Sequence, residues 1–310
     1  MPTENKQKAP RNRTVELDEN EYEPLRARIG TPAEPENAVI CGDCFEVLPN
    51  LPAATYDLMF ADPPYNLTKR FGAESAARRS DEEYEEWLDS WLRLCVPLLK
   101  ETASVYICGD WRSGAAIQRA GERYFTLRNR ITWEREKGRG AKANWKNASE
   151  DVWFFTVGDE YTFNLEAVKQ RRRVIAPYKE NGRPKDWSDS EDGKFRDTHP
   201  SNLWTDLTVP FWSMPENTDH PTQKPEKLLA KVILASTNPG DIILDPFAGS
   251  GTAAVVAKKL RRRFSVIEAD EQHCLTALKR LEMAEMDATI QGFEDGVFWE
   301  RNSGPKVRPK

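Results

Sequence analysis

The segment 242–260, with the sequence IILDPFAGSGTAAVVAKKL, contains a short apolar run, a loop with two glycines and a stretch rich in alanine and valine. This order predicts a β-strand, a tight turn and an α-helix that begins near Thr252. A glycine-bearing turn between a strand and a helix lets the backbone approach a ligand closely, and the helix N-terminus favours negative groups. The segment therefore predicts one half of a nucleoside-binding α/β fold.

The strand expected next, residues 264–267, is followed by Glu268, which stands 19 positions after Gly249. A carboxylate at that position can accept hydrogen bonds from ribose hydroxyls. The full dinucleotide pattern GxGxxG is absent, because no third glycine follows Gly251 at the required spacing. The pattern favours a cofactor that carries a nucleoside without a pyrophosphate, and a tight turn without a ligand is the alternative.

A second apolar run, residues 56–61, is stopped sharply by Asp62-Pro63-Pro64-Tyr65. The two prolines lack a backbone N–H, so the chain must leave the sheet there. Residues 84–99 carry apolar side chains at helical spacing and residues 104–108 resemble a buried strand, which together predict a parallel βαβ unit. Open α/β sheets bind ligands at the carboxyl ends of their strands, so Asp62 is a candidate for catalysis; an ordinary strand end stopped by proline is the alternative.

These two α/β stretches flank a polar middle region that is rich in tryptophan. The ends of the chain are polar and lack apolar periodicity, which is typical of flexible segments. We therefore predict a flexible arm, one folded domain made of a catalytic half, a middle region and a cofactor-binding half, and a flexible tail. Their boundaries are 1–36 for the arm, 37–301 for the domain with its parts at about 37–133, 134–215 and 216–290, and 302–310 for the tail.

The formal net charge of −5 disfavours a nucleic-acid partner when it is taken alone. Between residues 128 and 146, however, seven basic residues accompany only two acidic ones. Basic side chains contact phosphates and aromatic side chains stack on unpaired bases, so the middle region is a candidate nucleic-acid surface; a solvated charged face is the alternative. The candidate contacts are Arg135, Lys137, Arg139, Lys142, Lys146, Arg171 and Arg172.

The five cysteines are too few and too scattered for a disulfide framework. Cys41 and Cys44 have metal-ligand spacing, but no second pair of this kind exists and the three histidines show no paired spacing, so we expect no metal. No apolar run approaches the roughly 18 residues of a membrane span. The first residues lack an apolar secretory signal, and we expect a cytoplasmic protein without a membrane partner.

Three segments together resemble the motifs of amino-methylating DNA methyltransferases. They are the catalytic motif DPPY at residues 62–65, a third motif HPTQKP at residues 220–225 and the cofactor motif DPFAGSGT at residues 245–252. Their order is similar to that of the circularly permuted β class of these enzymes. The resemblance spans roughly residues 38–282 and implies a Rossmann-like, doubly wound α/β fold, with a mainly parallel seven-stranded sheet and an inserted target-recognition region.

The resemblance also implies S-adenosyl-L-methionine as the cofactor. The residues that would bind it are Asp43 and Cys44 near the adenine ring, Glu268 on the ribose hydroxyls, Phe247, Ala248, Gly249, Ser250, Gly251 and Thr252 along the methionine and ribose, His220, Thr222 and Lys224 at the carboxylate, and Asp62. Such an assignment gives the Cys41–Cys44 segment a role that needs no metal.

The catalytic residues implied by the resemblance are Asp62, Pro63, Pro64 and Tyr65. An exocyclic amine conjugated to its ring attacks poorly, because its lone pair is delocalised. In enzymes of this kind the Asp62 carboxylate and the Pro63 carbonyl would accept the two N–H bonds, while Tyr65 stacks on the base. A base inside double-stranded DNA cannot reach such a site, so it must be flipped out.

Among enzymes that resemble this chain, an aspartate at the first motif position, as at Asp62, is commoner with adenine and a serine with cytosine. The resemblance therefore favours N6 of adenine as the methylated atom, and N4 of cytosine is the alternative. An RNA amino-methyltransferase and a DNA-binding protein without catalysis are more distant alternatives. Motif order disfavours the first, and the complete motifs disfavour the second. Enzymes of this class often form homodimers, and the sequence leaves that state open.

Overall fold

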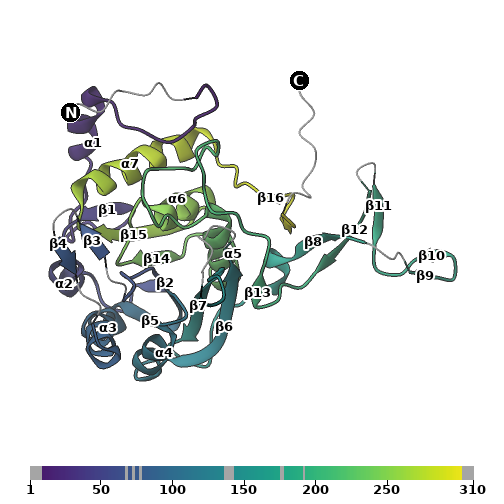
Figure 1. Ribbon diagram of the computed structural model, residues 1–310, viewed down its shortest axis with the longest axis horizontal. Coiled ribbons are helices and arrows are strands. Elements are labelled where there is room, and N and C mark those ends of the chain that lie inside the picture. The colour runs from purple at the N-terminus through teal and green to yellow at the C-terminus, as the bar shows by residue number, and fades with distance from the viewer. Residues whose placement is uncertain are drawn as a thin grey trace.

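A twisted eight-stranded sheet forms the centre of the protein (Figure 1). The computed structural model describes residues 9–66, 69–71, 74–76, 79–135, 143–174, 178–190 and 193–301. In sheet order the strands are β1 (Ala38–Cys41), β15 (Arg263–Glu268), β14 (Ile242–Asp245), β2 (Tyr56–Ala61), β5 (Leu99–Gly109), β7 (Ser149–Thr156), β6 (Thr126–Glu134) and β13 (Leu203–Trp204).

The pairing of these strands is mainly parallel, as the sequence predicts. The run from β1 through β15, β14 and β2 to β5 is parallel throughout. β7 is antiparallel to β5 and to β6, and β13 pairs with β6 in parallel. The expected seven-stranded α/β sheet is confirmed, and the two-residue β13 adds an eighth strand at the edge.

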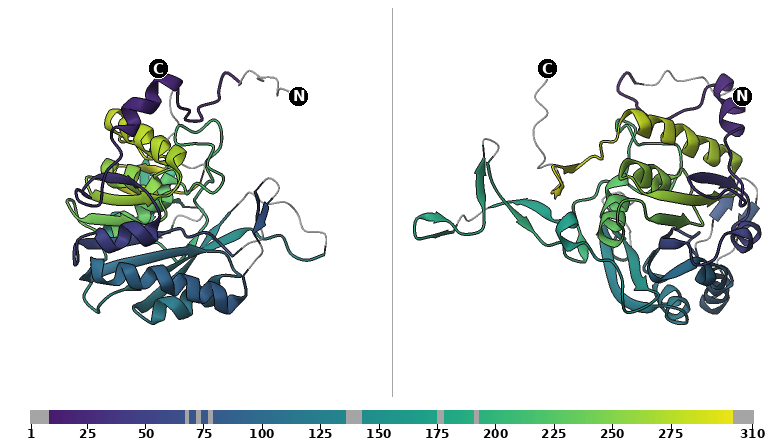
Figure 2. Two further views of the ribbon diagram at one scale, coloured as in Figure 1. Left: turned by 90° about the vertical axis from the view of Figure 1, so that its left-hand side faces the viewer. Right: turned by 180° about the vertical axis from the view of Figure 1, so that it is seen from behind.

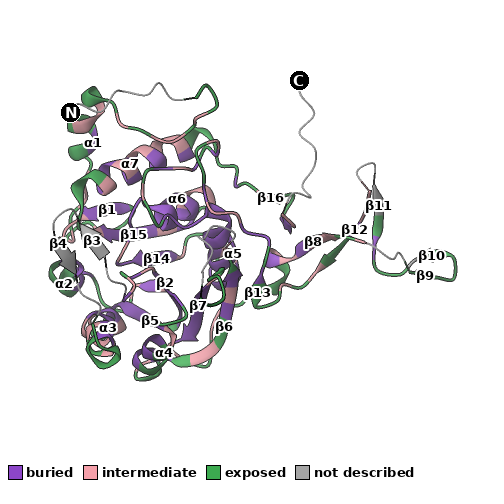
Figure 3. Cartoon of the chain, viewed as in Figure 1, coloured by how far each residue is buried: buried purple, intermediate pink, exposed green. Residues whose placement is uncertain are grey.

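Helices cover both faces of the sheet, which confirms the doubly wound arrangement. One face packs against α5 (Glu226–Ser236), α6 (Thr252–Lys259) and α7 (Glu271–Met286). The other packs against α2 (Cys44–Val47), α3 (Asp81–Cys95) and α4 (Gly114–Glu122). On β2, Leu58 faces the first layer and Met59 the second. Because both faces are buried, the central strands are continuously apolar, and Figure 3 colours them as buried.

The boundaries of α3 follow from its local sequence. Ser80 caps the helix by accepting the Glu83 backbone N–H at 3.1 Å, and the Glu83 carboxylate accepts the Ser80 backbone N–H at 2.8 Å, so the helix begins before the expected residue 84. It ends at Cys95, because Pro97 cannot continue it and the chain turns through the 3₁₀ helix η3 (Val96–Leu98). Leu99, which the sequence placed in the helix, begins β5.

The chain before the sheet contacts the body of the protein from Arg13 onward, where the Arg13 N–H donates to the Trp212 carbonyl at 2.6 Å, although we expected a flexible arm over residues 1–36. It forms η1 (Glu19–Glu21) and α1 (Tyr22–Arg26). A second 3₁₀ helix, η2 (Leu48–Asn50), comes later, directly after α2. Leu25 is buried with the α7 layer, and the Val15 N–H donates to the Asn217 carbonyl at 2.8 Å. The buried leucine, scattered half-buried apolar side chains, backbone pairing and ion pairs with α7 such as Arg26 with Glu271 fix this segment. These contacts leave no apolar periodicity in the sequence.

Part of the predicted middle region forms an extension that protrudes from the body (Figures 1 and 2), whereas β7 and β13, which also lie within residues 134–215, belong to the central sheet. The extension contains a five-stranded sheet and a small hairpin, and a separate hairpin follows the catalytic motif. After η4 (Leu165–Val168), the five-stranded sheet contains β8 (Gln170–Arg173), β11 (Ser188–Ser190), β12 (Gly193–Thr198), β16 (Phe293–Glu294) and β17 (Val297–Trp299). The small hairpin is formed by β9 (Lys179–Glu180) and β10 (Arg183–Pro184). The separate hairpin is formed by β3 (Lys69–Phe71) and β4 (Glu74–Ala76). Since β17 pairs with β8, the extension takes part of its sheet from residues beyond the cofactor-binding half.

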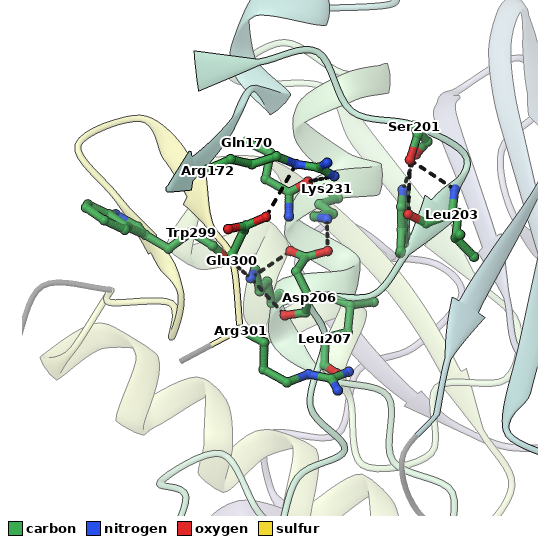
Figure 4. A network of polar contacts seen from close by, with 12 residues as sticks. Gln170, Arg172, Ser201, Leu203, Asp206, Leu207, Lys231, Trp299, Glu300 and Arg301 are labelled. Carbon is green, nitrogen blue, oxygen red and sulfur yellow. Dashed lines mark hydrogen bonds and ion pairs between the residues drawn. The ribbon is translucent and has the colours of Figure 1, made fainter. Parts of the chain in front are cut away.

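A buried ionic network joins the extension to α5 (Figure 4). The Asp206 carboxylate lies 2.7 Å from Lys227 Nζ and 2.6 Å from Lys231 Nζ. Burial lowers the pKa of Lys231 to about 8 despite the attraction of Asp206. Lys227 also donates to the Trp299 carbonyl on β17.

In the part of the chain that the structure describes, no helix is long and apolar enough to cross a membrane.

Candidate active site

The segments singled out in the sequence meet at the carboxyl edge of the parallel strands. β14 pairs directly with β2, with Leu244 opposite Met59, so the loops that follow both strands lie side by side. β1 pairs with β15 in the same way, with Cys41 opposite Glu268. A cleft of about 480 Å³ opens between these loops and residues 220–224. This volume lies within the range of small-molecule sites.

Nearly all of the predicted catalytic and cofactor-binding residues line this cleft. The lining includes the four residues of the catalytic motif and every predicted cofactor-binding residue except Gly251: Asp43, Cys44, Asp62, Pro63, Pro64, Tyr65, His220, Thr222, Lys224, Phe247, Ala248, Gly249, Ser250, Thr252 and Glu268. Sequence reasoning missed other lining residues, among them Phe45, Trp87, Asp245, Asp270 and His273. Of these, only Asp245 had a signal, because it opens the glycine-loop motif.

The two glycines of the loop serve different purposes. Gly249 has a φ of +53°, and a Cβ there would lie 2.9 Å from Nε2 of His220, so the imidazole packs directly on the loop. Gly251 has a φ of +76°, and a Cβ there would lie 2.4 Å from the Cβ of Ala277. Gly251 therefore allows α6 to approach α7 closely, which explains why it does not line the cleft.

Glu268 is held at the end of β15 by the backbone. Its Oε2 accepts the Gly249 N–H at 2.8 Å and its Oε1 accepts the Asp270 N–H at 2.9 Å, while Nδ1 of His273 lies 3.8 Å from Oε1. Burial opposes ionisation, but the contacts with His273 and the two backbone groups outweigh it and lower the pKa of Glu268. A fixed, ionised acceptor suits the hydroxyls of a ribose.

Asp62 stands where the catalytic loop meets the cleft. Its Oδ2 accepts a hydrogen bond from the Lys224 ammonium, and its Oδ1 accepts the Tyr65 hydroxyl at 3.1 Å. Burial lowers the pKa of Lys224, but the attraction of Asp62 and Glu150 more than offsets it, so the pKa stands above its ordinary value. The carbonyl of the exposed Pro64 accepts the Tyr84 hydroxyl at 3.1 Å, which fixes the path of the loop.

Glu150 is a buried carboxylate of the site that sequence reasoning did not identify. β7 runs antiparallel to β5, so its first residues lie at the carboxyl edge of the parallel strands. The Glu150 Oε2 accepts the Tyr65 hydroxyl at 3.3 Å and lies 3.6 Å from Lys224 Nζ. Its Oε1 is paired with Arg135. Two adjacent acidic residues at the start of an apolar strand, Glu150 and Asp151, were the available signal.

Asp245 ends β14, lines the cleft and is buried, with an exposed fraction of 3%. Its Oδ1 accepts the Phe247 N–H at 3.0 Å. Burial, together with repulsion by Asp62 and Glu268, raises the pKa of Asp245 to about 8 in spite of that hydrogen bond. The side chain is therefore largely protonated at neutral pH, which limits the negative charge in the cleft.

The predicted DNA contacts fall into four groups. Arg135 points into the site and pairs with Glu150, and Lys137, Arg139 and Lys142 lie outside the described residues. Lys146 is exposed. Arg171 makes two hydrogen bonds of 2.8 Å to Asp197, and Arg172 lies 3.6 Å from Glu300, so both serve ion pairs within the extension. Exposed cations on the extension that we did not predict include Lys179 and Arg183.

The fold and the cleft define a class of protein: a doubly wound α/β enzyme that binds a nucleoside-containing ligand beside a carboxylate, a lysine and a tyrosine. Comparison with known families gives the same class. The family described as DNA methylase, named for N6 and N4 methylation, matches residues 56–279. The chain belongs to this family, and it is an S-adenosylmethionine-dependent DNA amino-methyltransferase. The sequence-based identification of the family is thereby confirmed.

Individual relatives extend this comparison. The DNA adenine methyltransferase YhdJ of Escherichia coli (strain K12) is 35% identical over 264 residues, which are 83% of this chain and 85% of YhdJ. The structure of the PvuII DNA methyltransferase, described as cytosine-N4-specific, is 19% identical with a TM-score of 0.56, over 80% of this chain and 91% of that one. The TTHA0409 protein of Thermus thermophilus, complexed with S-adenosyl-L-methionine, is 20% identical with a TM-score of 0.55, over 84% and 97%.

Proposed function

We propose that this enzyme methylates the N6 amino group of an adenine flipped out of double-stranded DNA, with Asp62, Pro63, Pro64 and Tyr65 as its catalytic motif. One observation carries the proposal: the Asp62 carboxylate lines the same cleft as Glu268 and the glycine loop. A base held by Asp62 is therefore adjacent to a nucleoside cofactor. Adenine is favoured by the aspartate at position 62 and by the 35% identity to a protein named as a DNA adenine methyltransferase.

The residues of the cleft fit S-adenosyl-L-methionine. Glu268 offers an ionised acceptor for the ribose hydroxyls, and the glycine loop leaves backbone accessible beside them. Lys224, with Thr222 and His220 nearby, supplies a positive charge for the carboxylate of the methionine. Asp43 and Cys44 lie on the wall proposed for the adenine ring. When bound, the cofactor supplies an electrophilic methyl group on a sulfonium sulfur.

The chain's own residues would prepare the amine to attack that methyl group. The Asp62 carboxylate and the Pro63 carbonyl each accept one N–H of the target, which draws the nitrogen lone pair out of conjugation and aims it. The Asp62 charge also stabilises the positive charge that develops on the nitrogen. The Tyr65 ring stacks on the base, which offsets part of the cost of unstacking it from the duplex.

DNA contacts are proposed for the exposed cations around the cleft and along the extension, including Lys146, Lys179 and Arg183. Because phosphate contacts release counterions, the affinity for duplex DNA should fall with salt in a linear log–log relation.

A cytoplasmic location and a homodimer stay predictions from the sequence. Light scattering with and without DNA checks the homodimer.

The direct test is identification of the product. Duplex DNA of random sequence is incubated with the enzyme and a cofactor that carries a labelled methyl group, then digested to nucleosides and analysed by mass spectrometry. We expect the label in N6-methyladenine. Label in N4-methylcytosine would overturn the choice of base and keep the amino-methyltransferase, and label at carbon 5 of cytosine would overturn both.

A further inference from the structure

Glu150 is a carboxylate in a place where packing alone does not require one. Its exposed fraction is 6%, and it lies near the start of β7 in a run that is otherwise apolar from Val152 onward. A buried carboxylate is costly unless cations and hydrogen bonds compensate for its lost hydration. Here Arg135 and Lys224 supply the cations, and Tyr65 supplies a hydroxyl hydrogen.

Two donors of the site lie between the same two carboxylates. The Tyr65 hydroxyl is 3.1 Å from an oxygen of Asp62 and 3.3 Å from an oxygen of Glu150. The Lys224 ammonium binds Asp62 and lies 3.6 Å from Glu150. A tyrosine hydroxyl has one hydrogen, so it can donate fully to only one of the two carboxylates at a time. The proposed reaction asks Asp62 to accept the amino group of the target as well.

We propose that Glu150 is a positioning residue for methyl transfer, which keeps the Tyr65 hydroxyl and the Lys224 ammonium in place while Asp62 accepts the target amine. This inference rests on the proposed function. With Asp62 engaged by the base, the Tyr65 hydrogen turns to Glu150, and Lys224 keeps a second carboxylate nearby. Tyr65 then stays in register for stacking, and Lys224 stays at the end of the cofactor cleft.

Arg135 completes the arrangement from the other side. It pairs with the Glu150 oxygen that faces neither Tyr65 nor Lys224, so it balances the charge of Glu150 without competing for its role. Arg135 also follows β6 directly, at the start of the connection to β7. The inference therefore gives this predicted DNA contact a function inside the site.

The experiment compares Glu150→Gln with Asp151→Asn in the full-length enzyme. Asp151 is the next residue of β7, is also buried at 7% exposed, and accepts the Thr132 hydroxyl at 2.7 Å on the opposite face of the sheet, so it is a matched control. Single-turnover methylation of saturating duplex DNA and the cofactor dissociation constant are measured for both variants. We expect Glu150→Gln to slow methylation by about 10- to 100-fold, the scale of a small misplacement of reacting groups, with a smaller change in cofactor affinity.

Two further variants separate positioning from simple structural damage. Glu150→Asp keeps the charge and should recover part of the rate. In a Tyr65→Phe background, which keeps the ring and removes the hydroxyl, Glu150→Gln should cost several-fold less than in the wild type, because the two changes act on one contact. Purely structural damage would instead combine with Tyr65→Phe additively.

The Asp62→Asn variant, measured in the same assay, tests the proposed function. It therefore separates failure of the proposed function from failure of the positioning role of Glu150. If Asp62→Asn is inactive while Glu150→Gln matches the wild type, the positioning role is overturned and the proposed function stands. If Glu150→Gln and Asp151→Asn are equally slow, or if the effect adds to that of Tyr65→Phe, the positioning role is also overturned. If Asp62→Asn methylates at the wild-type rate, the proposed function itself fails.

Discussion

The cofactor cleft and the extension are built on opposite principles. The cleft is assembled at one edge of a buried parallel sheet from segments that are far apart in the chain, and its functional groups are fixed by backbone contacts such as those of Glu268. The extension consists of short strands in which buried, half-buried and exposed residues alternate over a few positions (Figure 3). Some of its charged side chains form internal pairs, such as Arg171 with Asp197. On this basis we propose that the sheet edge carries the chemistry and that the extension carries DNA recognition.

The largest expected effect comes from breaking the junction between the two regions. Asp206→Asn leaves Lys227 and Lys231 buried without their carboxylate, so we expect a loss of about 3–5 kcal/mol of unfolding free energy. Asp197→Asn, which removes the partner of the half-exposed Arg171, is the control and should cost no more than about 1 kcal/mol. Denaturant unfolding measures both, and equal losses would contradict the difference between junction and surface.

The cleft should show a pH dependence that Asp245 causes. Its pKa is about 8 in the folded protein and near 4 when unfolded, so the folded state holds the proton more tightly and stability is lost as the pH rises between those values. Asp245→Asn stays neutral, and its stability relative to the wild type should improve by up to about 1.4 kcal/mol per pH unit between pH 5 and 7. A difference between the two proteins that does not change with pH would contradict the buried, protonated state.

Glu268→Ala tests whether the cleft binds the cofactor through Glu268. Loss of hydrogen bonds to a charged acceptor should weaken S-adenosylmethionine binding by about 1–3 kcal/mol, measured by calorimetry. Glu180→Ala, on the exposed hairpin of the extension, is the control and should leave the cofactor dissociation constant unchanged. An unchanged constant for Glu268→Ala would remove Glu268 from the cofactor site.

The smallest effect is expected on the surface of the extension. Lys179→Gln together with Arg183→Gln should flatten the salt dependence of DNA binding by about 0.9 for each phosphate that is no longer neutralised, without changing the methylation rate on saturating DNA. Filter binding over a series of salt concentrations measures the slope. If the slope stays as in the wild type, these two cations are only a solvated face.

The parts of the site that could be predicted from the sequence are the short loops that directly follow central strands. The Asp62 loop and the glycine loop carry their own turn residues, and the pairing of parallel strands brings their ends together. Glu150 was missed because its partners Tyr65 and Lys224 are distant in the sequence, and no spacing connects them. Figure 4 illustrates the same difficulty at the junction, where Asp206 meets lysines of α5 through tertiary packing alone.

The extension was less predictable for a related reason. The strand β8 has the sequence QRRR, which indicates a charged surface and gives no strand periodicity. It becomes a strand because β12 and β17 supply its partners, and β17 comes from residues 297–299 at the far end of the domain. Pairing between such distant segments leaves no local pattern for sequence reasoning to find.

The most direct test of a single cofactor cleft at the carboxyl edge is hydrogen exchange with and without S-adenosylmethionine. The account predicts that the cofactor slows amide exchange in residues 41–44, 220–224, 245–251 and 268–270, which line the cleft or adjoin it, and leaves residues 179–190 of the extension unchanged. Protection confined to the extension, or absent from the glycine loop and from Glu268, would contradict it.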